Sequence, residues 1–147
     1  MVSLFLLMTT AFAALDANGA KDIAAKMIPA GAKHLYTKTS NMDYKVQFIN
    51  ESSNTHYEIA VSRLTGKIME SKARVRGNSA SNSIKINEQQ ARNILLADHP
   101  RAIISSTKLI ADNGYKLYHL EFSDGNIKGQ YEINPETGIV VEKYLKY

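Results

Sequence analysis

The chain contains no cysteine. The side chains that could take part in catalysis or bind a metal are therefore its four histidines, its serines and its carboxylates. The histidines are at positions 34, 56, 99 and 119, and no two have the close spacing, such as i and i+4 on a helix, that metal ligands need. No serine lies in the Gly-x-Ser-x-Gly pattern of a hydrolase nucleophile. Without cysteine there are no disulfides, thiolate metal sites or cysteine nucleophiles. The sequence therefore predicts no metal site, no cofactor and no nucleophile.

The carboxylates do not suggest acid–base catalysis either. The carboxylates of the second half are predicted to lie on strand faces or in turns, and they are Glu121, Asp124, Glu132, Glu136 and Glu142. We therefore expect a protein that binds rather than an enzyme.

Exposed tyrosines and turn residues are the candidates for contact with a protein partner. Tyrosine on a sheet face is a common contact residue in interfaces, although it can also simply cover the sheet beside its neighbours. Turns project from the fold and tolerate variation. The predicted partner-binding residues are Tyr36, Tyr115, Asn50, Asn54, Asp124, Asn126, Pro135 and Glu136.

The positive charge of the chain suggests a second kind of partner. The formal net charge is +4 and the pI is about 9.2. The densest basic cluster is Lys72, Arg74 and Arg76, which could bind an anionic polymer of the cell envelope. The alternative is that the positive charge has no specific target. The other lysines are scattered, which argues against nucleic acid.

The second half has clear boundaries between its expected elements. Asn87 and Gln90 have the spacing of a capping box, and His99-Pro100 ends the helix that follows. Turn signals at Asp112–Gly114, Ser123–Asn126 and Asn134–Gly138 separate four runs of strand length. These runs are Arg101–Ala111, Tyr115–Ser123, Ile127–Asn134 and Ile139–Tyr147.

The first half reads as a related copy. Asn18 is expected to cap a helix over Ala20–Ile28, and strands are expected at Lys33–Thr39, Tyr44–Ile49, His56–Ser62 and Lys67–Val75. Tyr44–Phe48 repeats the pattern of Tyr118–Phe122, and Thr65-Gly66 repeats Thr137-Gly138. These matches indicate an internal duplication, with the polar run Arg76–Ser83 as a linker.

The N-terminus has the features of an export signal. Val2–Phe12 is apolar and too short to span a bilayer, and Ala11-Phe12-Ala13 fits a signal-peptidase site. No Lys or Arg precedes the apolar run. We expect cleavage after Ala13 or Ala14.

The second half resembles the PepSY domain family. The resemblance rests on the capped helix at Ile86–Leu96, the strand Tyr118–Phe122, and Tyr131–Asn134 leading into Thr137–Val140. It implies a non-enzymatic module of exported bacterial proteins and of the propeptides of secreted metallopeptidases, which restrains peptidases. It also implies a helix packed on a curved antiparallel sheet.

The predicted fold class is α+β, with two tandem modules that each pack one helix on an antiparallel sheet of about three to four strands. The predicted boundaries are a signal peptide at 1–14, a first module at 15–75, a linker at 76–83 and a second module at 84–147. The preferred function is steric restraint of a secreted or envelope peptidase. The alternatives are binding of an envelope polymer or small ligand, and assistance to the folding of a neighbouring exported enzyme.

Overall fold

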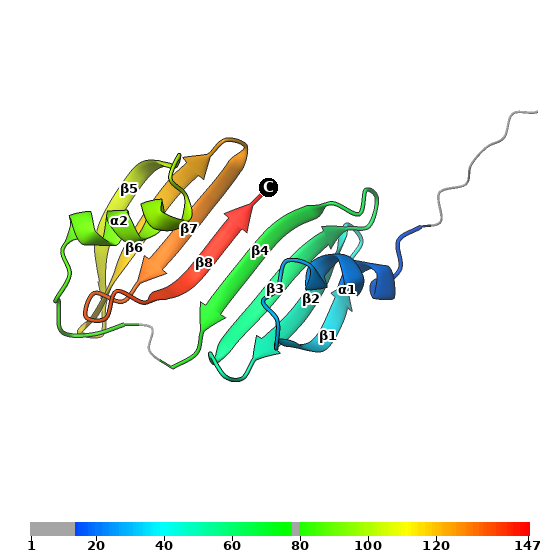
Figure 1. Cartoon of the computed structure of the whole chain (residues 1–147), viewed down its shortest axis with the longest axis horizontal. Coiled ribbons are helices and arrows are strands. Elements are labelled where there is room, and N and C mark those ends of the chain that lie inside the picture. The colour runs from blue at the N-terminus through cyan, green and yellow to red at the C-terminus, as the bar shows by residue number, and fades with distance from the viewer. Residues whose placement is uncertain (1–13, 78–79) are drawn as a thin grey trace, which may run out of the picture.

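The computed structural model describes residues 14–77 and 80–147, which form two helices and eight strands (Figure 1). The predicted signal peptide lies outside the described residues, apart from Ala14. In chain order the elements are α1 (Ala17–Ala25), β1 (Lys33–Thr39), β2 (Asp43–Asn50), β3 (Thr55–Ser62), β4 (Ile68–Val75), α2 (Glu88–Asp98), β5 (Ile103–Asp112), β6 (Tyr115–Asp124), β7 (Ile127–Ile133) and β8 (Val140–Lys146).

The eight strands form one antiparallel sheet in the order β1-β2-β3-β4-β8-β7-β6-β5. The predicted fold class of two tandem helix-on-sheet modules is therefore wrong, because the chain is mostly β and has a single sheet. The two halves join where Glu70–Arg74 of β4 pair with Glu142–Lys146 of β8. As the last strand of its half, each of β4 and β8 would otherwise expose a row of backbone N–H and C=O groups, and pairing the two edges satisfies those groups.

The ends of the helices follow from local capping. Asn87 and Gln90 form the predicted capping box at the start of α2. In α1 the cap is Asp16 and not Asn18, since the Asp16 carboxylate accepts a hydrogen bond from the Gly19 backbone N–H at 2.7 Å. Aspartate and asparagine are comparable caps, so the sequence alone did not decide between the two positions.

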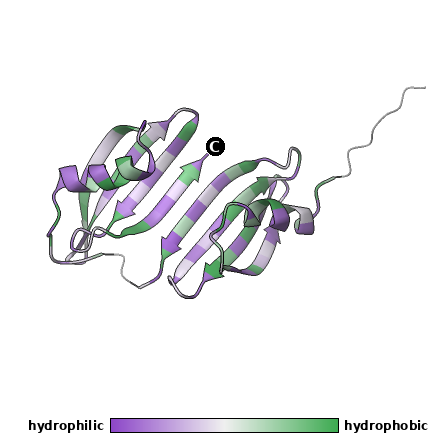
Figure 2. Ribbon diagram, in the orientation of Figure 1, coloured by the Kyte–Doolittle hydropathy of each residue, from purple (hydrophilic) through white to green (hydrophobic). Residues whose placement is uncertain are grey.

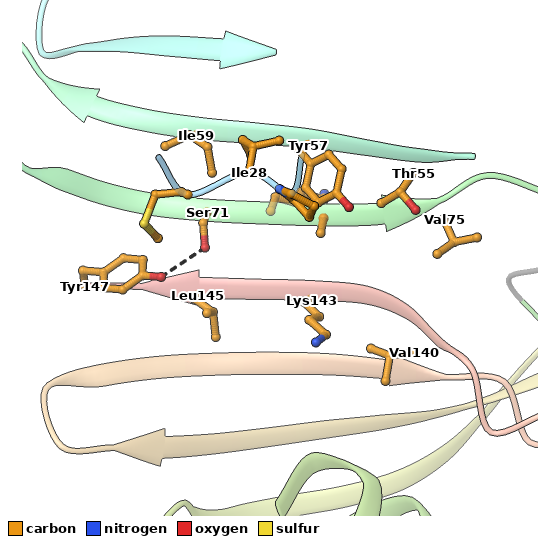
Figure 3. Close-up of a pocket in the computed structure, with 14 residues that line it drawn as sticks. Ile28, Thr55, Tyr57, Ile59, Ser71, Val75, Val140, Lys143, Leu145 and Tyr147 are labelled. Carbon is orange, nitrogen blue, oxygen red and sulfur yellow. Dashed lines mark hydrogen bonds between the residues drawn. The ribbon is translucent and has the colours of Figure 1, made fainter. Parts of the chain in front are cut away.

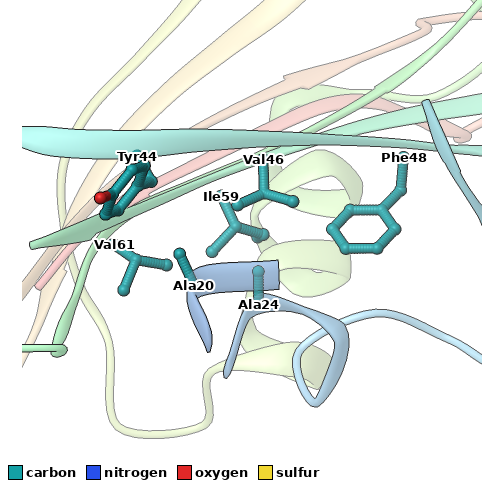
Figure 4. Close-up of a cluster of buried hydrophobic side chains, with 7 residues drawn as sticks. All are labelled: Ala20, Ala24, Tyr44, Val46, Phe48, Ile59 and Val61. Carbon is teal, nitrogen blue, oxygen red and sulfur yellow. The ribbon is translucent and has the colours of Figure 1, made fainter. Parts of the chain in front are cut away.

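Both helices pack on the same face of the sheet, each over its own apolar cluster (Figure 1). We call the opposite side of the sheet the uncovered face. Apolar and polar residues alternate along the strands (Figure 2), and the apolar ones of the two clusters pack with the helices, so the intervening polar side chains lie on the uncovered face. The first cluster, in Figure 4, is Ala20, Ala24, Tyr44, Val46, Phe48, Ile59 and Val61; the second is Ala91, Leu95, Tyr118, Leu120, Phe122, Tyr131 and Ile133.

One contact occurs in the same form in both halves. The Tyr44 hydroxyl donates to the Leu15 carbonyl at 2.9 Å, and the Tyr118 hydroxyl donates to the Ile86 carbonyl at 2.8 Å. Each acceptor directly precedes the helix cap, so each tyrosine ties the start of a helix to the sheet. The matching contact supports the predicted duplication, which stays a prediction.

Part of the predicted linker is held against the second half. Ser81 is buried, and its backbone exchanges two hydrogen bonds with that of Lys116, at 3.0 and 2.7 Å. Its hydroxyl donates to the Glu136 carboxylate at 2.6 Å. Residues 78 and 79 of the linker lie outside the described residues.

Candidate functional site

The helices leave the middle of their face of the sheet open. α1 contacts β1, β2 and β3, whereas α2 contacts β5 and β6. Of the three strands between, β7 contributes Tyr131 and Ile133 to the cluster under α2, whereas β4 and β8 contribute no buried residue to the cluster under either helix. A groove of about 400 Å³ lies there (Figure 3).

We call this feature the seam groove, because it lies over the β4–β8 pair that joins the halves. Ser71 and Ala73 of β4 and Leu145 of β8 line it from below, and Ile28, Tyr57 and Ile59 come from the first half. The small side chains of Ser71 and Ala73 fill little of the space between the helices, which leaves the hollow. The lining is mainly apolar, as is usual for sites that hold a ligand or a side chain of a partner.

The space between the helices is wide enough for another element. α1 lies over β2 and β3, and α2 lies over β5 and β6, so about five strand spacings, or roughly 24 Å, separate them. Packed helices lie about 8–10 Å apart. One extended or helical segment of a partner would therefore fit between α1 and α2 on β4 and β8.

One side of the groove is fixed by a polar network. Lys143 of β8 and the Tyr131 hydroxyl both donate to the Asp98 carboxylate at the end of α2, and the Tyr131 bond is 2.9 Å long. Partial burial alone would raise the pKa of Asp98, but the bonds from Lys143 and Tyr131 outweigh it and hold this pKa below its usual value. Burial, together with the bond to Asp98, raises the pKa of Tyr131. The network therefore holds a charged carboxylate and a neutral phenol at neutral pH.

We expect Asp98→Asn to weaken the acid dependence of stability. The folded-state pKa of Asp98 is lowered, so its contribution is present above the unfolded pKa of about 3.9 and is lost as pH falls through the folded pKa. Thermal unfolding between pH 7 and pH 2 would show a higher Tm for wild type than for the variant at pH 7. The difference in Tm should disappear below about pH 4. Asp22→Asn, an exposed site on α1 without a contact of this kind, is the control. A gap that stays constant across the range would contradict this prediction.

The loops predicted to bind a partner lie at two opposite ends of the sheet. Asn50 and Asn54 flank the β2–β3 turn, and Pro135 and Glu136 lie in the β7–β8 connection, at the same end. Asp124–Asn126 forms the β6–β7 turn at the other end. These loops therefore do not form one surface.

Some of these loop residues already have intramolecular roles. Pro135 is fully buried, and its carbonyl accepts from the backbones of Lys85 and Ile86. The bonds from Ser81 and Lys85 lower the pKa of Glu136. Asp124 lies 3.2 Å from the His99 ring nitrogen.

The two predicted tyrosines lie far apart. Tyr36 of β1 and Tyr115 of β6 are 56% and 57% exposed. Tyr36 pairs with Gln47 at one edge of the sheet, and Tyr115 pairs with Asp112 near the other. Both are accessible, but no single small contact surface includes the two.

The predicted basic cluster is partly neutralised. Lys72 and Arg74 lie on either side of Glu142 of β8, at 3.4 and 3.2 Å, and the Glu142 side chain is only 17% exposed. Arg76 follows β4, where its backbone N–H donates to the Asn54 carbonyl. The structure thus uses two of these three cations to join the halves.

Sequence reasoning missed the seam groove, because its residues come from strands paired across the two halves. One signal was present. Ser71 and Ala73 are small where a central strand under a helix would carry large apolar residues.

Within residues 14–77 and 80–147, no three His, Asp or Glu side chains come together as a metal site would require. No helix in the same ranges has the length and apolar character of a membrane span.

Residues 85–144 match the family model described as the peptidase propeptide and YPEB domain, or PepSY. This segment of the chain is therefore similar to PepSY domains. PepSY domains are protein-interaction modules and are generally not catalytic. Comparison with curated proteins gives no significant match.

Three solved structures are similar to the chain. The C-terminal domain of YpeB from Bacillus megaterium has a TM-score of 0.52 and 12% identity, and the match covers 88% of this chain and 62% of that one. The chain thus spans less than two thirds of that structure, and the likeness shows the fold alone. A protein described as a lipoprotein from Clostridium difficile 630 has a TM-score of 0.35 and 16% identity, over 88% of this chain and 91% of that one. A protein described as periplasmic from Bacteroides eggerthii has a TM-score of 0.34 and 11% identity, with 84% of each chain covered.

Proposed function

We propose that this protein is exported, binds a secreted or envelope peptidase through the seam groove, and restrains it sterically without chemistry of its own. The observation that carries the proposal is the open apolar groove over β4 and β8. It is lined by both halves, so it exists only because they share a sheet. The choice of a peptidase rests on the PepSY domain, whose family includes peptidase propeptides by description.

The lining of the groove suits a protein partner. Protein interfaces are usually built around a few buried apolar anchors inside a polar rim. The groove offers apolar walls from Ile28, Tyr57 and Leu145, and its rim carries the paired charges of Lys143 and Asp98. These charges already neutralise each other, so an apolar partner segment can enter without leaving either of them unpaired.

The loops at one end extend the same surface. Thr55, which follows the β2–β3 turn, lines the groove, as do Val75 and Val140 at the corresponding ends of β4 and β8. A partner segment in the groove would therefore pass the turn that carries Asn50 and Asn54. Restraint would follow if that segment borders the substrate cleft of the peptidase.

We expect Ala73→Gln to weaken binding of the partner peptidase by about tenfold or more, since about 1.4 kcal/mol corresponds to each factor of ten. Ala73 lies on the groove floor between Tyr57 and Lys143, so a longer polar side chain would fill the hollow without changing the net charge. The measurement is titration of peptidase activity in the native secreted fraction, with the captured peptidase quantified beside it. Ala111→Gln, an exposed position on β5, is the matched control.

The proposal requires a stoichiometric fall in peptidase activity that Ala73→Gln abolishes and Ala111→Gln preserves. A rise in the yield of active peptidase during refolding would instead indicate a folding helper. Equal inhibition by wild type and both variants would show that the groove does not bind the peptidase.

A further inference from the structure

The uncovered face of the sheet carries two pairs of lysines that face each other across neighbouring strands. Lys38 of β1 is opposite Lys45 of β2, and Lys146 of β8 is opposite Lys128 of β7. Like charges directly opposite in an antiparallel pair are destabilising. We call these four residues the lysine row.

The register places all four on one line across the sheet. Lys45 pairs with Ala60, Ala60 with Glu70, and Glu70 with Lys146. The two lysine pairs are thus separated by three strand spacings between β2 and β8, or about 14 Å, and the whole line covers about 24 Å.

Within the described residues, none of the four lysines has an ion pair or a hydrogen bond from its side chain. Glu70 is the acidic residue in the line, and its carboxylate bonds the Tyr144 hydroxyl. The line therefore keeps a strong excess of positive charge.

The same face also carries a pair of like-charged acidic residues, which have cations beside them. Glu132 of β7 is opposite Glu142 of β8, but Lys72 and Arg74 flank Glu142, and His119 lies 3.9 Å from Glu132. The fold thus places two cations beside Glu142 and a histidine near Glu132, whereas the carboxylate opposite Lys146, that of Glu70, accepts a hydrogen bond from Tyr144 and no carboxylate in the line faces Lys38, Lys45 or Lys128. One carboxylate faces four lysines in the line, so the remaining positive charge is available to solvent ions or to an anionic ligand.

A shallow hollow adjoins the second lysine pair. It has a volume of about 550 Å³ and is lined by Lys128, Lys146, Ser123, Gln130 and Tyr144, and also by Glu121, whose carboxylate lies 3.6 Å from the His119 ring nitrogen. These hydroxyl and amide groups can bond anionic oxygens beside the two ammonium groups.

We propose that the lysine row binds an extended anionic polymer that bears phosphate groups and runs across the strands. Charge complementarity carries this choice, because the two pairs lie along a line that a chain of repeated anions can follow. The four side chains of the row are all charged, in contrast to the mainly apolar lining of the seam groove, so the row does not resemble the core of a protein interface. The site is independent of the proposed peptidase binding and lies on the opposite face of the sheet.

The test is binding of long-chain polyphosphate to the whole protein at salt concentrations between about 50 and 200 mM. We expect the double variant Lys128→Gln/Lys146→Gln to bind about tenfold more weakly at low salt, with a slope of log affinity against log salt that is smaller by roughly 1.5. Lys21→Gln/Lys26→Gln removes the same charge from α1 and its C-terminal cap on the other face, and should change the affinity by less than about twofold. Inorganic phosphate, tested alone, should compete poorly because it reaches only one lysine pair.

The Lys128→Gln/Lys146→Gln variant removes the repulsion between these two lysines, so its Tm should be no lower than that of wild type. Weaker polyphosphate binding by this variant would therefore not be caused by unfolding. Equal losses in the two double variants would overturn the proposal, because they would show attraction by net charge alone. Absence of polyphosphate binding would also overturn it, and so would tighter binding of an acidic peptide of equal charge.

Discussion

Tyr131→Ala is expected to lower the free energy of unfolding by about 3–5 kcal/mol, the range for removing a large aromatic side chain from a core. Tyr131 is 1% exposed. Its ring packs edge-on against Phe122 at 5.5 Å and His99 at 5.9 Å, and the Lys143 ammonium group lies 5.2 Å from its centre. The variant loses these contacts and leaves a cavity beneath α2.

Urea unfolding followed by circular dichroism would measure this loss, because the sheet supplies the signal. Tyr131→Phe is the control, since it keeps the ring and removes only the hydroxyl that donates to Asp98. We expect that variant to lose about 1–2 kcal/mol. If Tyr131→Ala loses no more than Tyr131→Phe, the ring does not contribute to the core as the structure indicates.

The second large effect is expected at Gly129, where even a methyl group does not fit. A Cβ built on Gly129 would lie 2.3 Å from two carbons of the Phe122 ring and 3.0 Å from a methyl carbon of Leu145. Phe122 cannot easily move away, because His99 lies 4.8 Å from it and Tyr131 packs on its other side. We therefore expect Gly129→Ala to lower the free energy of unfolding by about 1–3 kcal/mol, the usual cost of overpacking.

A double-mutant cycle identifies the cause. Phe122→Leu alone should be destabilising, but it removes the ring atoms that oppose a methyl group at position 129. In that background, Gly129→Ala should cost at least about 1 kcal/mol less than in wild type. Additive losses would place the cost of the alanine elsewhere, for example in the backbone of β7.

Both positions bear on the seam groove as well as on stability. Tyr131 holds Asp98, which in turn holds Lys143 on the groove rim. Gly129 is paired with Leu145, which lines the groove. If substitutions at Tyr131 or Gly129 weaken partner binding, the cause can be the lost stability rather than the groove. Ala73→Gln tests the groove directly.

Local patterns in the sequence were sufficient for most elements. Alternating apolar residues predicted the strands, and β1 has the predicted bounds Lys33–Thr39. The spacing of Asn87 and Gln90 predicted the capping box of α2, which the structure confirms. The start of α1 was placed too late, because Asp16 and Asn18 are both good caps; in the structure Asp16 is the cap, and the Leu15 carbonyl before it accepts a hydrogen bond from Tyr44.

Candidate contact residues were harder to predict. Tyr36 and Tyr115 are both exposed, as predicted, but the sequence did not predict their separation across the sheet. Pro135 looked like an exposed turn residue, yet it is buried beneath the connection that leads to α2.

The sequence by itself determined the strands, the capped second helix, the alternation that gives the sheet a covered and an uncovered face, and the PepSY resemblance that the family comparison confirmed. These depend on contacts between residues close in the chain. Only the tertiary structure decided that β4 and β8 pair, because strand pairing between residues about 70 positions apart leaves no local pattern. That one pairing turns two expected sheets into one, creates the seam groove between the helices, and aligns the two lysine pairs on a single row.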